Sequence, residues 1–137
     1  MINNRKRLFF LLAILMLSYM FVGCNEKKED ISVTISIEGP EDVGIILETT
    51  TVNVEEGETV INLLKNIAKD NKIHLDFTGS KSTAYVKGID NIYEFDKGSE
   101  SGWTYKVNNE VQNVSAGSYK LKDGDSIEWI YLIELGN

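Results

Sequence analysis

Near the end of the chain stands Ser126-Ile127-Glu128-Trp129-Ile130-Tyr131-Leu132-Ile133, the stretch that decides the fold. Large apolar side chains alternate along one of its faces, as in a strand with one buried side. The other face is also apolar at Ile130 and Leu132, which predicts that the strand is buried on both sides. Such a strand belongs in the middle of a sheet that carries a helix on one side.

One helix is predicted at roughly residues 59 to 71, with Thr59 as its N-cap. Its apolar residues recur at positions i, i+3, i+4, i+7 and i+8 and make a continuous stripe, which has to pack on a sheet face. They are Val60, Leu63, Leu64, Ile67 and Ala68.

An N-terminal hairpin is predicted before this helix. Residues 31 to 37 alternate between apolar and polar side chains and are ended by Gly39-Pro40, and a second β-rich run covers residues 45 to 54. Further short strands are expected at residues 73–77, 84–87, 92–95, 102–107, 111–114 and 126–133. Hairpin, helix, short strands and a central C-terminal strand predict an α+β fold, a β-grasp-like mixed sheet with one main helix packed on one face.

The N-terminus has the pattern of a secretory leader, because Arg5, Lys6 and Arg7 precede an uncharged run from Leu8 to Val22. A helix of that length reaches about 22 Å, short of the ~30 Å hydrocarbon core of a bilayer. A cleaved signal peptide over residues 1–23 is therefore favoured over a transmembrane anchor.

Cys24 follows Phe21-Val22-Gly23 in a sequence that looks like a bacterial lipobox, with Phe21 where Leu is usual. We expect Cys24 to be lipidated and to anchor the protein on the extracytoplasmic side of the cell membrane. The alternative is a free cysteine in an ordinary leader. Cys24 is the one cysteine of the chain, so no intramolecular disulfide can form. Residues 24–30 then make a polar tether, and the folded domain spans residues 31–137.

The expected mature chain is strongly acidic. Without the three basic residues of the leader, 11 of the 14 basic residues remain against 21 acidic ones, a net charge of −10. Such a surface repels phosphate backbones and anionic lipids, so nucleic acid is not expected as a partner, and membrane contact is expected through the lipid alone.

The sequence gives little support for a catalytic site or a metal site. His74 is the one histidine, placed in a predicted strand with no nucleophile motif beside it, so a structural or solvent-facing role is favoured. Asp123-Gly124-Asp125, with Glu128 nearby, has some of the oxygen ligands of a calcium site but lacks the EF-hand spacing, and a turn is the simpler interpretation. We therefore expect no enzyme and no required cofactor or metal.

Aromatic residues follow a loop that should be exposed and mobile, residues 97 to 102. Trp103 and Tyr105 share one face of the next strand, which a tight-turn pair, Asn108-Asn109, ends. Periodicity favours a place in the core. The alternative is a flat apolar platform with polar edges for a planar ligand or a carbohydrate.

Three blocks in this region resemble the bacterial family DUF4430, which is similar to the C-terminal β-domain of transcobalamin and intrinsic factor. The blocks cover residues 101–108, 113–119 and 121–129, with weaker agreement at residues 60–67 and 85–90. The resemblance implies an extracytoplasmic β-grasp-like domain whose vitamin-carrier relatives clasp cobalamin between this domain and a helical barrel. With one helix predicted in the mature chain, we do not expect that barrel here.

Candidate ligand-binding residues are carried over from these blocks. Trp103 and Tyr105, after Gly102, match aromatic and apolar positions of the relatives' strand, and Ser115, Ala116 and Tyr119 match a loop that approaches the corrinoid. The turn at residues 122 to 124 matches the turn that follows. Residues 97 to 102 and 115 to 119 are favoured for ligand contact. Trp103 is expected to support these two segments from the core.

Two functions remain open. The first is a lipid-anchored, non-catalytic binding module for cobalamin or another small organic ligand, in uptake or delivery to a membrane transporter. The second is a surface adhesion or structural module that binds cell-envelope polymer or a protein partner.

Overall fold

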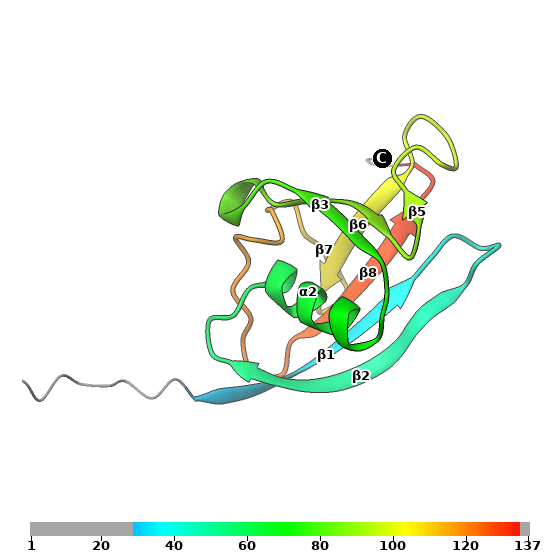
Figure 1. Ribbon diagram of the computed structural model, residues 1–137. Helices are drawn as coiled ribbons and strands as arrows, with labels where there is room; N and C mark the ends of the chain where they lie inside the picture. The colour runs from blue at the N-terminus through cyan, green and yellow to red at the C-terminus, as the bar shows by residue number, and fades with distance from the viewer. Residues whose placement is uncertain (1–28, 135–137) are drawn as a thin grey trace, which may run out of the picture.

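The computed structural model describes residues 29–134 (Figure 1). The expected leader, Cys24 with its expected lipid, and most of the tether lie outside the described residues. Within them, no helix is long and apolar enough to cross a membrane.

A five-stranded mixed sheet forms the body of the fold, in the order β2-β1-β8-β6-β7. Its strands are β1 (Asp30–Glu38), β2 (Ile45–Glu55), β6 (Gly102–Val107), β7 (Glu110–Val111) and β8 (Ser126–Leu132). β1 and β2 form the predicted hairpin, and β8 runs parallel to β1 and antiparallel to β6. β8 is therefore the central strand, as predicted, and the order is that of a β-grasp fold.

The helix α2 (Val60–Asp70) lies across one face of this sheet (Figure 1). Its predicted apolar stripe is buried, together with Ile61. Thr59 is the N-cap residue of α2, as predicted, although its hydroxyl makes no capping hydrogen bond. The backbone N–H of Thr59 instead donates to the carboxylate of Glu58 at 2.9 Å.

A second, three-stranded sheet was not expected. It has the order β3-β4-β5 and consists of β3 (Leu75–Thr78), β4 (Tyr85–Ile89) and β5 (Ile92–Tyr93), with the short 3₁₀ helix η2 (Lys81–Thr83) between β3 and β4. Strands were predicted at these places, but periodicity does not say which strands pair. Val86 and Ile89 of β4 are buried in the same core as α2 and the large sheet.

The prediction that β8 is buried on both faces is wrong. Ile127, Trp129 and Tyr131 point into the core and are buried, whereas Ile130 and Leu132 on the outer face are half-buried. No described element covers that face as α2 covers the other. The central position of β8 follows from its pairing on both sides, and not from a second layer.

Candidate functional site

An open pocket of about 400 Å³ lies beside β6, between the strand, η2 with the start of β4, and the segment from Gln112 to Ala116. We call it the β6 pocket. The residues that line it are Ser82, Thr83, Ala84, Tyr85, Trp103, Thr104, Tyr105, Gln112, Asn113, Val114, Ser115, Ala116 and Trp129. Hydroxyl, amide, apolar and aromatic groups make up the whole lining, and no charged side chain belongs to it.

Four aromatic side chains contribute to the wall. Trp103, Tyr105 and Trp129 are 5%, 4% and 3% exposed, whereas Tyr85 is 44% exposed. The first three lie on the buried face of the large sheet, where Tyr105 is the cross-strand neighbour of Trp129. All three residues therefore belong to the core and also line the β6 pocket. The periodicity of Trp103 correctly favoured the core, and its contact with a ligand stays a prediction.

The two tryptophans of the pocket differ in their hydrogen bonding. The indole N–H of Trp103 donates to the carbonyl of Ile92 at 2.8 Å. The indole N–H of Trp129 is buried and has no partner within residues 29–134. An unsatisfied buried donor costs about 1 to 3 kcal/mol, so such groups are rare in folded proteins. One of the residues that line the pocket thus contains a buried hydrogen-bond donor that the described chain does not use.

Two tyrosines in the pocket stay neutral to high pH. Burial raises the pKa of Tyr105 to about 12, and its hydroxyl donates to the carbonyl of Val114 at 2.9 Å. The hydrogen bond from Tyr85 to Glu94, 2.6 Å long, raises the pKa of Tyr85 to about 12 as well. Near pH 7 the lining therefore carries no charge.

The segment from Gln112 to Ala116 is held against η2 by Ser115 and Gly117. The Ser115 hydroxyl lies 2.8 Å from the Ala84 carbonyl and 3.3 Å from the Lys81 carbonyl. A Cβ on Gly117 would lie 1.9 Å from the same Lys81 carbonyl, so only glycine fits there. Ser115 therefore positions the pocket wall through its hydrogen bonds.

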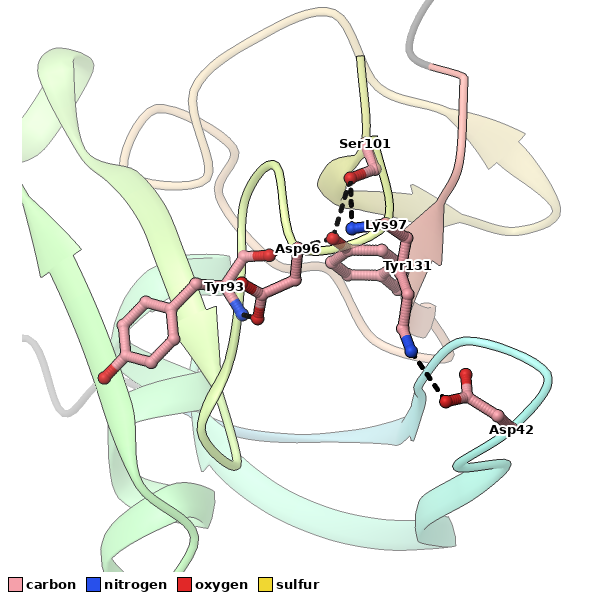
Figure 2. Close-up of polar contacts among 6 residues, drawn as sticks. All are labelled: Asp42, Tyr93, Asp96, Lys97, Ser101 and Tyr131. Carbon is pink, nitrogen blue, oxygen red and sulfur yellow. Dashed lines mark hydrogen bonds and ion pairs between the residues drawn. The ribbon is translucent and has the colours of Figure 1, made fainter. Parts of the chain in front are cut away.

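The loop before β6 is fastened by a buried hydroxyl pair (Figure 2). Ser101 is fully buried, and its Oγ lies 2.9 Å from the Tyr131 hydroxyl and accepts from the Lys97 backbone N–H at 3.1 Å. The Lys97 ammonium reaches Asp42 in the β1–β2 hairpin at 2.6 Å. The sequence predicted an exposed loop, and residues up to Glu100 are exposed, but Ser101 and Gly102 are buried.

Of the six predicted ligand-binding residues, four line the β6 pocket: Trp103, Tyr105, Ser115 and Ala116. Gly102 is buried and Tyr119 is half-buried, and neither lines it. The Tyr119 hydroxyl donates to Asp125 at 3.3 Å, which is a contact within the protein. Whether any of the six binds a ligand stays a prediction.

The pocket also contains residues that sequence reasoning did not select, notably Tyr85, Gln112, Val114 and Trp129. Val114 is 50% exposed, a large apolar side chain left at the surface. Trp129 was assigned to the core from its strand periodicity, and the sequence carries no signal that its indole N–H lacks a partner.

The acidic turn has a structural role. Asp125 is 5% exposed and accepts from the Asn108 amide and from the Lys122 backbone N–H, both at 3.0 Å. Asp123 accepts from the Ser32 backbone N–H at 2.8 Å. Among the described residues no group of three or more His, Cys, Asp or Glu could hold a metal ion. His74 lies just before β3, exposed, with its Nε2 3.2 Å from the Tyr93 hydroxyl.

Solved structures share this fold. Haptocorrin in complex with Cbi matches with a TM-score of 0.64 at 22% identity, over 83% of this chain and 28% of that chain. A candidate metal-binding protein from Ruminococcus gnavus ATCC 29149 matches with a TM-score of 0.50 at 14% identity, over 74% of this chain and 96% of that one. At these identities the likeness shows the fold alone, and this chain spans less than a third of haptocorrin.

A comparison with curated proteins finds no match. The family model described as "Domain of unknown function (DUF4430)" matches residues 57–132, which include α2, every residue that lines the β6 pocket and the whole of β8. The chain therefore belongs to the DUF4430 family.

Proposed function

We propose that this protein is a non-catalytic binding module that holds part of a small organic ligand in the β6 pocket. The observation that carries the proposal is the pocket itself, which has a volume of about 400 Å³ and is lined by aromatic residues and by residues with hydroxyl and amide groups. Apolar walls with a few placed polar groups are typical of small-molecule sites. The lining holds no carboxylate, imidazole or amine that could serve as acid, base or metal ligand.

A corrinoid such as cobalamin is the first ligand to test. Haptocorrin, which has a domain of this fold, was solved in complex with Cbi. Because the present chain spans 28% of that protein, we propose that it covers one side of its ligand and that a second protein, such as a membrane transporter, covers the rest. Lipid attachment at Cys24 would hold the module beside such a transporter.

Calorimetric titration of the full chain in detergent with cobalamin tests this function. Saturable heat, together with a rise in Tm at excess ligand, is expected, because a ligand that binds only the folded state stabilises it. The absence of both effects would exclude a corrinoid as the ligand. Retention on cell-envelope polymer without any response to small ligands would favour an adhesion module instead.

A further inference from the structure

The β6 pocket runs along the open edge of a strand. Trp103, Thr104 and Tyr105 are consecutive and all line it, although the side chain of Thr104 projects from the opposite face of the sheet to the other two. A hollow that touches both faces of one strand lies beside its edge. β7 pairs only with Lys106 and Val107, so no strand within residues 29–134 pairs with this edge of β6 between Gly102 and Tyr105.

The register of β6 shows which main-chain groups point toward the pocket. The Asn108 N–H donates to the Ser126 carbonyl at 2.9 Å, which marks that pair as hydrogen-bonded. Hydrogen-bonded and non-hydrogen-bonded pairs alternate in an antiparallel ladder. The pair of Trp103 with Tyr131 is therefore non-hydrogen-bonded, and the N–H and C=O of Trp103 point away from β8.

The neighbours of Trp103 on this edge confirm the direction. The Tyr105 carbonyl accepts from the Gln112 N–H at 3.1 Å, and the Ser101 carbonyl accepts from the Phe95 N–H at 2.9 Å. Trp103 lies between them, where the chain at Asn113 has separated from the edge. Its N–H and C=O therefore have no main-chain partner within residues 29–134. They form an adjacent donor and acceptor on a residue that lines the pocket.

The pocket also discriminates by charge. None of its lining side chains is charged, and the chain as a whole has 14 basic against 21 acidic residues. An anion placed there would lose hydration without gaining a cationic partner. A carboxamide suits the site, because it is neutral and carries a donor and an acceptor side by side.

We propose that the β6 pocket recognises an uncharged ligand through a carboxamide group, which binds the main-chain N–H and C=O of Trp103. This inference rests on the proposed binding function and adds the chemical class of the group that is recognised. The unpartnered indole N–H of Trp129 is consistent with a further acceptor on the ligand. It is covered in this structure, so a ligand would reach it only after a neighbouring side chain moves.

Three probes with one phenyl ring test the proposal: phenylacetamide, methyl phenylacetate and phenylacetate. Both tryptophans of the chain line the pocket, so their fluorescence reports occupancy in the full chain in detergent. Phenylacetamide is expected to bind about fivefold more tightly than the ester, which lacks the donor, and the carboxylate more weakly still. Val114→Lys should abolish the response, whereas Val111→Lys, a 49% exposed residue outside the pocket, should leave it unchanged.

Equal affinities for amide and ester, a preference for the carboxylate, or no response to the amide would overturn the carboxamide assignment. If the amide preference fails in one of these ways but the chain still binds cobalamin, and Val114→Lys weakens that binding, the proposed function stands. If the chain does not bind cobalamin but still prefers the amide probe, a corrinoid is excluded as the ligand and the carboxamide class stands.

Discussion

Tyr105 of β6 and Trp129 of β8 are cross-strand neighbours, with ring centroids 5.3 Å apart and ring planes tilted by 35°. The Tyr105 hydroxyl has a partner in the Val114 carbonyl, whereas the indole N–H of Trp129 has none in the described chain. Both residues belong to the core and also line the β6 pocket. Substitutions here must therefore separate a loss of stability from a loss of binding.

The same substitution at the two tryptophans should have unequal effects on stability. Trp103→Phe removes the hydrogen bond to the Ile92 carbonyl, whereas Trp129→Phe removes a buried donor that is unsatisfied. Both side chains are at least 95% buried, so the loss of packing from the same Trp→Phe change should be similar at the two positions. We expect Trp103→Phe to lower the free energy of unfolding by about 1 to 3 kcal/mol more than Trp129→Phe.

Urea unfolding of the two variants, followed by circular dichroism, measures this difference. The slopes with denaturant should be equal, so that the midpoints can be compared directly. Equal destabilisation, or a larger effect at Trp129, would mean that the Trp129 N–H is satisfied in the folded protein.

Gly117→Ala should disturb the pocket wall. Its Cβ would lie 1.9 Å from the Lys81 carbonyl, so the segment that carries Ser115 must move away from η2. Overpacking of this kind costs about 1 to 3 kcal/mol. Thermal unfolding should show a lower Tm, whereas Ser118→Ala, an exposed change in the same loop, should have an effect within about 0.5 kcal/mol. A Tm equal to that of the wild type would show that this loop is not packed as described.

Alkaline pH should destabilise the fold through its buried phenols. Burial raises the pKa of Tyr105 to about 12, above the ordinary value near 10. The folded state therefore holds the proton more tightly than the unfolded state, and its contribution is fully present below about pH 10 and is lost as the pH rises toward 12. Tm measured from pH 8 to 11.5 should fall above pH 10, with a shallower fall in Tyr105→Phe. An identical pH profile in the variant would contradict burial as the cause.

Much of the large sheet could be predicted from the sequence because β1 and β6 alternate between buried and more exposed side chains. β6 was placed at residues 102–107, as observed, and Asn108-Asn109 was recognised as a turn, where both residues have positive φ. The second sheet could not be predicted in the same way. Its strands are short, and their pairing depends on the turn at Asp90 and Asn91 and on packing against the core.

The candidate site was predicted only in part. Trp103 and Ser115 were selected through a family resemblance, and the structure places both at the β6 pocket. Val114 was missed because its exposure depends on where the chain leaves the edge of β6. Trp129 was missed as a pocket residue because its periodicity indicates only a place in the core, and nothing in the sequence shows that its indole N–H lacks a partner. The full burial of Ser101 was missed because a serine in a polar loop gives no sign of a buried partner such as Tyr131.

The central claim, that the β6 pocket is a ligand site, is tested most directly by comparing Val114→Lys with Val111→Lys. Both valines are about half exposed, and only Val114 lines the pocket, so both variants should fold with nearly unchanged Tm. In calorimetric titrations with cobalamin, we expect Val111→Lys to bind like the wild type and Val114→Lys to bind at least tenfold more weakly, a difference of about 1.4 kcal/mol. Equal affinity of the two variants for cobalamin would contradict a ligand site in this pocket.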